Sequence, residues 1–97
     1  MPSYIVLANF TDQGIRHIKD SPKRATALRE MAQKLSIAVK EIYWTLGPYD
    51  VVTILDAPDE ASVTALGLSI GALGNVRTQT LRAFTTAEIG PILGRLA

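Results

Sequence analysis

The segment Gly47-Pro48-Tyr49-Asp50 constrains the fold of this 97-residue chain more than any other. An apolar, β-rich run over Val39–Leu46 precedes it, and a second run over Val51–Asp56 follows it. Glycine permits a positive φ and proline presets the next φ, so these residue types favour a tight turn. The middle of the chain is therefore predicted to be a β-hairpin.

Hydrophobic periodicity predicts further elements on both sides of this hairpin. Apolar residues alternate near the N-terminus as they do in a strand, and Leu28, Met31 and Leu35 recur at helical spacing. The other predicted elements are a strand over Tyr4–Phe10, a short helix after Thr11 through Ile18, a helix restarting at Ser21-Pro22, a helix from Asp56-Ala57-Pro58-Asp59 to about Leu73, and a strand over Val76–Phe84.

Local signals mark the ends of the second long helix. Asp56 is expected to cap its start, because a carboxylate accepts hydrogen bonds from free amides of the first turn. Gly74-Asn75 is expected to stop it in a left-handed conformation. Within the helix, Gly67 and Gly71 share a face, which predicts a close approach to a neighbouring element.

A last helix is predicted at the C-terminal end. Thr85-Thr86-Ala87-Glu88 has the form of a capping box, and an apolar stripe follows it. Gly90-Pro91 interrupts the pattern, so this helix is expected either to be short or to begin at Pro91.

The predicted order is β-α-β-β-α-β, a ferredoxin-like α+β fold with both helices on one face of a four-stranded antiparallel sheet. We expect one domain over residues 1–97. The other sheet face is left bare although its residues are not uniformly polar, and exposing it costs about 25 cal/mol per Å². The C-terminal helix is expected to cover part of that face and a second copy of the chain the rest, which predicts a homodimer or higher oligomer.

Composition excludes several classes of function. The net charge of +1 is too small to attract nucleic acid or an anionic membrane electrostatically. No apolar run reaches the roughly 18 residues that span a bilayer. The chain has no cysteine, so disulfides and thiolate metal sites are not expected. A signal-type N-terminus is also missing, and the expected location is the cytoplasm.

Several of these segments together resemble the GYD-domain family. The matching segments are Tyr4-Ile5-Val6-Leu7, Thr11-Asp12-Gln13-Gly14, Ser21-Pro22, Leu46-Gly47-Pro48-Tyr49-Asp50, Asn75-Val76-Arg77-Thr78 and Leu81-Arg82-Ala83-Phe84. The likeness runs along nearly the whole chain and includes the Gly-x-Tyr-Asp turn. It implies a ferredoxin-like fold of the dimeric α/β-barrel type. It implies no single activity, because similar folds serve monooxygenases, isomerases, haem proteins and regulatory domains.

The turn itself supplies the first candidate site residues. Asp50 can hydrogen-bond amides of the turn, which makes a structural role the favoured interpretation. The alternative is that Tyr49 and Asp50 form a proton-handling pair at the mouth of a pocket.

Polar residues on the strands supply further candidates for ligand binding. Thr80 and Arg82 share one side of the last predicted strand, and Tyr43 shares one side of the second strand with Glu41. Threonine suits strands on propensity alone. Arg82 is too costly to bury unpaired, so it is expected to meet a carboxylate such as Glu41, to reach a dimer edge, or to await an anionic ligand, and the ion pair is the favoured arrangement.

His17 is the only histidine, and the sequence gives it no partner for metal binding. A solvated helix face is the favoured interpretation, with a role in ligand binding as the alternative. No metal and no cofactor are expected, because no phosphate loop, dinucleotide fingerprint or catalytic triad is present.

Two functions remain after these exclusions. The favoured one is a non-catalytic homo-oligomeric module that binds a small metabolite or a partner protein at the sheet face. The alternative is a small cofactor-free enzyme, monooxygenase-like or isomerase-like, in which Tyr43 or Tyr49, Asp50 and Arg82 act as acid, base and anion clamp. The two differ in whether those side chains converge on one cavity.

Overall fold

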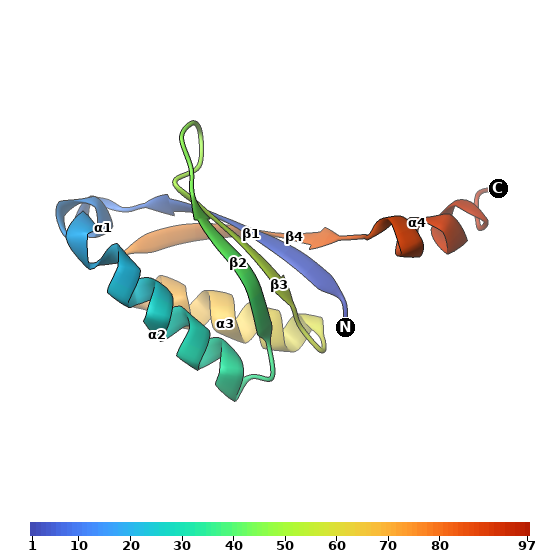
Figure 1. Cartoon of the computed structure of the whole chain (residues 1–97), viewed down its shortest axis with the longest axis horizontal. Helices are drawn as coiled ribbons and strands as arrows, with labels where there is room; N and C mark the ends of the chain where they lie inside the picture. The colour runs from blue at the N-terminus through green and yellow to red at the C-terminus, as the bar shows by residue number, and fades with distance from the viewer.

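A computed structural model describes residues 1–97 and shows one sheet, two long helices and several short helical segments (Figure 1). The elements in chain order are β1 (Ser3–Phe10), α1 (Asp12–Arg16), the 3-10 helix η1 (Ile18–Asp20), α2 (Ser21–Lys34), β2 (Ala38–Trp44), β3 (Val51–Asp56), α3 (Glu60–Ala72), β4 (Val76–Ala83) and α4 (Thr86–Leu93).

The four strands form one antiparallel sheet in the order β2-β3-β1-β4. This order and the β-α-β-β-α-β sequence of elements confirm the predicted ferredoxin-like α+β fold. The hairpin prediction is also confirmed, because β2 and β3 are neighbours joined by residues 45–50. The β2–β3 register shifts between Val39 and Glu41, which leaves Lys40 at a bulge.

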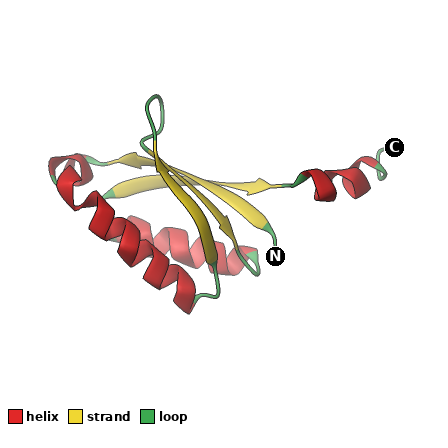
Figure 2. Cartoon of the chain, viewed as in Figure 1, coloured by secondary structure: helices red, strands yellow, loops and turns green.

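The core lies between the sheet and the helices α2 and α3, which both cover the same face (Figure 2). Alternate residues of the two central strands point into it, and small or apolar residues of the helices meet them. The buried members of this core are Tyr4, Val6, Ala32, Ile37, Leu55, Ala57, Val63 and Leu66.

The N-terminal cap of α3 differs from the prediction. Asp59 fills that position, and its carboxylate accepts a hydrogen bond from the Ser62 backbone N–H at 2.8 Å. Asp56 ends β3 instead, where it accepts from the Ser3 hydroxyl at 3.0 Å and pairs with Lys40 at 3.1 Å. The strand therefore runs to the residue that was expected to open the helix.

The start of α1 lies against the backbone before β4, and this close approach requires glycine at position 14. A Cβ there would lie 1.9 Å from the backbone oxygen of Asn75, so no other residue fits without displacing the chain. Thr11 strengthens the same contact, because its hydroxyl donates to the Gly74 carbonyl at 2.6 Å. Gly74 has a φ of 82°, which confirms the left-handed stop of α3.

The predicted close approach at Gly67 and Gly71 is wrong. A Cβ on Gly67 would meet only the Thr78 hydroxyl, at 3.9 Å, and one on Gly71 would meet nothing within 4 Å. These glycines leave room beside α3 instead of permitting tight packing there.

The face of the sheet away from α2 and α3 has no cover within the chain (Figure 2). We call this surface the open face. Its residues follow from the strand register, and none of them is fully buried. They include Ile5, Leu7 and Asn9 on β1, Glu41 and Tyr43 on β2, Val52 and Ile54 on β3, and Arg77, Gln79 and Leu81 on β4, with Ser3, Asp56 and Ala83 at the strand ends.

Helix α4 projects beyond the end of β4, away from the rest of the chain (Figure 1). The capping box is confirmed, because Thr85 and Glu88 exchange both of its hydrogen bonds. The helix is short and continuous through Pro91, so the alternative start at Pro91 is wrong. It buries none of its residues, and the expectation that it covers part of its own open face is also wrong.

This projection makes the molecule long and thin, with extents of 50 × 31 × 18 Å. The radius of gyration is 14.6 Å, whereas a compact domain of this length has about 12.5 Å. None of the helices has both the length and the apolar character that crossing a membrane requires.

Candidate functional site

The Gly-Pro-Tyr-Asp turn is tied to the C-terminal end of β1 through Asp50. The backbone N–H of Asp50 donates to the Ala8 carbonyl at 2.9 Å. Its carboxylate accepts from the Phe10 backbone N–H, also at 2.9 Å. Because β3 begins only at Val51, the carboxylate supplies the acceptor that a longer strand would have given to Phe10.

The remaining residues of the turn are held by hydrogen bonds as well. The Thr45 hydroxyl donates to the Tyr49 carbonyl at 2.6 Å, and the Asn9 side chain donates to the Pro48 carbonyl at 2.8 Å. Gly47 has a φ of 125°, a conformation that side-chain-bearing residues rarely adopt. Turn geometry thus accounts for every residue of the signature except the Tyr49 side chain.

Tyr49 points its phenol toward β4. The hydroxyl donates to the Gln79 side-chain oxygen at 3.2 Å, and Gln79 belongs to the open face. Tyr43 lies on the same face, opposite Val52, and is half exposed. The two tyrosines therefore belong to the open face at different strands, and neither contacts Asp50 through its hydroxyl.

Arg82 lies on the opposite side of the sheet, next to two aromatic rings. Its guanidinium carbon is 5.6 Å from the ring centre of Tyr4 and 4.3 Å from that of Phe84. The guanidinium also donates to the Ser3 carbonyl at 3.2 Å and to the Ala83 carbonyl. Arg82 is thus held between aromatic faces at the end of the sheet where β4 leads to α4.

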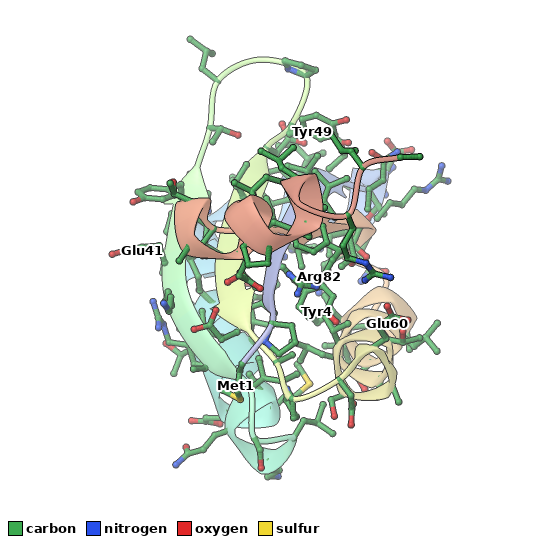
Figure 3. The ribbon with its side chains drawn as sticks, turned by 90° about the vertical axis from the view of Figure 1, so that its right-hand side faces the viewer. Met1, Tyr4, Glu41, Tyr49, Glu60 and Arg82 are labelled. Carbon is green, nitrogen blue, oxygen red and sulfur yellow. The ribbon has the colours of Figure 1, made fainter.

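The carboxylate partner of Arg82 is Glu88 on α4, at 3.3 Å. The expected partner Glu41 faces the other side, because it lies opposite Ile54 on the open face while Arg82 lies opposite Tyr4. Figure 3 shows Arg82 beside Tyr4 and Glu41 at the far edge of the sheet. An ion pair was correctly expected, but with the wrong acid.

The contacts at the start of α4 also lower the pKa of Glu88. The Thr85 backbone N–H, with Arg82 as a second donor, holds the pKa of the Glu88 carboxyl below its ordinary value. Asp56 shows a similar balance. Burial opposes its ionisation, but donation by Lys40 and Ser3 outweighs burial and lowers its pKa. Both acids stay ionised to hold elements together.

The two remaining candidates lie apart from these groups. Thr80 is exposed on the edge strand β4, opposite Val6 and on the side that faces the helices. His17 is exposed between α1 and η1, at the other end of the molecule from α4. No three histidine, aspartate or glutamate side chains come close enough together to hold a metal ion.

The six candidates therefore do not meet within one chain. Tyr43 and Tyr49 belong to the open face, Asp50 holds the turn, and Thr80 and Arg82 lie on the reverse side. None of the six lines the cavity between the sheet and the helices, which has a volume of about 120 Å³. None lines the polar hollow beside Asp12 either.

Sequence reasoning missed two features of this arrangement. One is the pairing of Arg82 with Glu88, for which the capping box was the available signal because it fixes Glu88 near the end of β4. The other is the cavity beneath the helices, which depends on the spacing of α2 and α3 and has no signal in the sequence.

Comparison with known proteins identifies relatives of the whole chain. The GYD domain matches residues 4–93. A protein of Thermus thermophilus is 34% identical over 90 residues, which are 92% of this chain and 95% of the relative. That relative is named glutamine synthetase and cystathionine beta-lyase binding protein.

Solved structures support the same fold. A Thermus thermophilus protein aligns with a TM-score of 0.57 at 30% identity, over 89% of this chain and 96% of its own. The feast or famine regulatory protein of M. tuberculosis, solved with L-methionine, aligns with a TM-score of 0.67 at 21% identity over 89% of this chain. The leucine response regulatory protein of Mycobacterium tuberculosis gives a TM-score of 0.57 at 18% identity over 88% of this chain.

The two M. tuberculosis regulators share the fold. This chain spans about half of their length, 52% of the feast or famine regulatory protein and 51% of the leucine response regulatory protein. The domain match and the Thermus relative both extend along nearly all of this chain, through the turn and the strand β4. On that basis the chain belongs to the GYD-domain family.

Proposed function

We propose that this chain is a non-catalytic module that pairs with a second copy through its open face and binds a partner protein as that assembly. The partner class we favour is an enzyme of amino-acid metabolism, such as glutamine synthetase or cystathionine β-lyase. The observation that carries the proposal is the open face together with the unpacked helix α4, because both are surfaces that one chain leaves in water.

The chemistry of the open face suits an interface between proteins. Its apolar side chains lie mainly in the middle of the two central strands, and its charged and amide groups lie on the edge strands β2 and β4 and at the strand ends, at Asn9 and Asp56. An apolar centre inside a polar rim is the usual anatomy of a protein interface. No helix of the same chain crosses the face (Figure 2), and the Tyr49 side chain of the hairpin turn reaches over one end of it to Gln79.

The size of the surface points to the pairing of two copies. Four strands spaced about 4.8 Å apart, each contributing about seven residues of about 3.3 Å, present roughly 450 Å² in projection. A stable dimer buries about 800 Å² on each partner. The open face supplies a large part of that area, and α4 would supply more by docking on the other copy.

Helix α4 and the residues after it carry exposed apolar side chains, which would be buried if they packed against another protein surface. Four apolar residues of this segment are exposed by between 37% and 74% of their area. They are Ile89, Ile92, Leu93 and Leu96. The Arg82–Glu88 pair joins the start of the helix to the end of β4, and the helix points away from the sheet (Figure 1). A second copy is the occupant we propose for this stripe.

The Thermus relative supports binding of a partner protein. Its name describes a protein that binds two enzymes, and its likeness to this chain covers nearly the full length of both. The candidate acid and base groups favour binding over catalysis, because the Asp50 carboxylate already accepts from the Phe10 backbone and Arg82 is already paired. We propose the cytoplasm as the place of action, where such enzymes occur.

A direct binding measurement tests this function. The purified chain is immobilised, and purified glutamine synthetase and cystathionine β-lyase from the same organism are passed over it separately. We expect saturable binding of at least one enzyme. We also expect that binding to be lost when a charge is placed in the open face by Leu81→Glu. Absence of binding to both enzymes would contradict the proposed partner class.

The control for that measurement is Leu68→Glu. Leu68 is 70% exposed on α3, on the covered side of the sheet, whereas Leu81 is 48% exposed on the open face. Both changes introduce the same charge at an exposed leucine. Equal loss of binding in the two variants would show a general charge effect and would count against the open face.

A further inference from the structure

A cavity of about 120 Å³ lies between the sheet and the two long helices. Its floor is the helix-facing side of the central strands, and its walls are α2 and α3. It is separate from the open face, because residues of one strand point alternately to the two sides of the sheet. Among its apolar lining residues are Val6, Leu28, Met31, Trp44, Leu55 and Ile70.

Small residues on the two helices leave this space empty. Ala25 lines it from α2 and Gly67 lines it from α3. A Cβ on Gly67 would meet only the Thr78 hydroxyl, at 3.9 Å. A larger side chain would therefore fit there, and the gap results from the residue types at these positions as well as from the helix spacing.

Three of the polar side chains around the cavity, Ser21, Arg24 and Trp44, are already engaged. The Trp44 indole N–H donates to the Ser21 hydroxyl at 2.9 Å. The Arg24 guanidinium donates to the Gly14 carbonyl at 3.2 Å and lies 5.9 Å from the ring centre of Phe10. No acidic residue lines the cavity. A cation would therefore lose its water without gaining a partner, and the one charged side chain at the cavity, Arg24, already donates to a backbone carbonyl, so the lining favours an uncharged occupant.

We propose that this cavity binds an uncharged, mainly apolar molecule of about the size of benzene. An engineered protein cavity of about 150 Å³ with apolar walls binds benzene, and the volume here is similar, with the half-exposed side chains of Trp44 and Leu73 at its open rim. Thr53, which is only 5% exposed, lies on the floor and offers one hydroxyl to such a molecule. Small aromatic or branched aliphatic compounds are the expected class.

Benzene is the probe that tests this site, and Trp44 is the reporter. It is the only tryptophan of the chain and it lines the cavity, so its fluorescence is expected to change as benzene binds. We expect a saturable change with benzene, together with a higher melting temperature in its presence. We expect neither effect with benzoate, which has a similar ring and a negative charge.

Two matched variants locate the binding. Gly67→Leu fills the cavity and is expected to weaken benzene binding at least tenfold, while Gly71→Leu changes an exposed position of the same helix that meets nothing within 4 Å. The second variant is expected to bind as the unchanged chain does. If Gly67→Leu fails to fold, Gly67→Ala, which adds a single methyl group, is expected to weaken binding to a smaller degree.

Three results would overturn the proposal. They are no saturable response to benzene, benzene binding that survives in both Gly67 variants, and equal loss of binding in the Gly67→Leu and Gly71→Leu proteins. These results are independent of the open face, so the cavity site can fail while the binding of partner proteins stands, and the reverse also holds.

Discussion

The carboxylate of Asp50 accepts a hydrogen bond from the backbone N–H of Phe10 across 2.9 Å. The two residues are 40 positions apart, so this bond joins the hairpin turn to the end of the first strand. It gives the last residue of the family signature a structural role. The aspartate completes the backbone hydrogen bonding of β1 just where its neighbour β3 has not yet begun.

This role predicts the outcome of changing Asp50. Replacement by alanine leaves the Phe10 N–H without its acceptor in a partly buried position, and we expect the free energy of unfolding to fall by about 1–3 kcal/mol. Asp50→Asn keeps an acceptor oxygen and should cost less. Urea denaturation of both variants measures the difference. A proton-handling role would instead leave the stability of Asp50→Asn unchanged and abolish a functional response.

The contact of Gly14 with Asn75 predicts a second loss of stability. Gly14→Ala places a Cβ against a backbone oxygen that cannot rotate away, so we expect a loss of about 1–3 kcal/mol in the free energy of unfolding. Gly71→Ala is the control, because it meets nothing within 4 Å and should gain up to about 1 kcal/mol from helix propensity. A Gly14→Ala protein as stable as the unchanged chain would refute the close approach.

The attachment of α4 should depend on pH through Glu88. The pKa of Glu88 is lowered in the folded chain from an ordinary value of 4.5. Because the pKa is lowered, the ionised Glu88 carboxylate stabilises the folded chain fully at pH values above the ordinary pKa. That stabilisation is lost as the pH falls through the pKa of the folded chain. We therefore expect the start of α4 to loosen only in acid below about pH 4.5.

Amide chemical shifts of Thr85 measure this titration, since its N–H donates to the Glu88 carboxylate at 3.0 Å. We expect the shift to titrate in the unchanged chain and to lose that transition in Glu88→Gln. The Ser62 amide, which donates to Asp59, should titrate equally in both proteins. A Thr85 titration that persists in Glu88→Gln would show that another group controls this end of the chain.

Much of the fold could be predicted from the sequence because its signals are local. The alternation of β1, the proline at the start of α2, the stop at Gly74 and the capping box at Thr85 each depend on residues within a few positions. Such short-range patterns need no knowledge of the tertiary structure.

Most of the errors concern residues whose partners are set by the tertiary structure. Asp56 was expected to cap a helix, but it pairs with Lys40 across the β2–β3 bulge. Glu41 was named as a possible partner of Arg82, but the sheet register places these two side chains on opposite faces. The direction of α4 also lies outside sequence reasoning, because it depends on contacts between elements such as the Arg82–Glu88 pair.

The candidate site was predicted less well for the same reason. Tyr43, Tyr49 and Arg82 carry chemistry that suits a site, yet only the strand register decides which of them share a face. The cavity beneath α2 and α3 depends on the separation of two helices. No residue pattern encodes that distance.

The mass of the full chain in solution at micromolar concentration tests the central claim most directly, measured by light scattering on a sizing column. One chain has a mass of 10.5 kDa, and we predict at least twice that value for the unchanged protein and for Leu68→Glu. Leu81→Glu is predicted to shift toward a single chain. A mass of 10.5 kDa for the unchanged, folded protein would contradict the account, because the open face and α4 would then be stable in water alone.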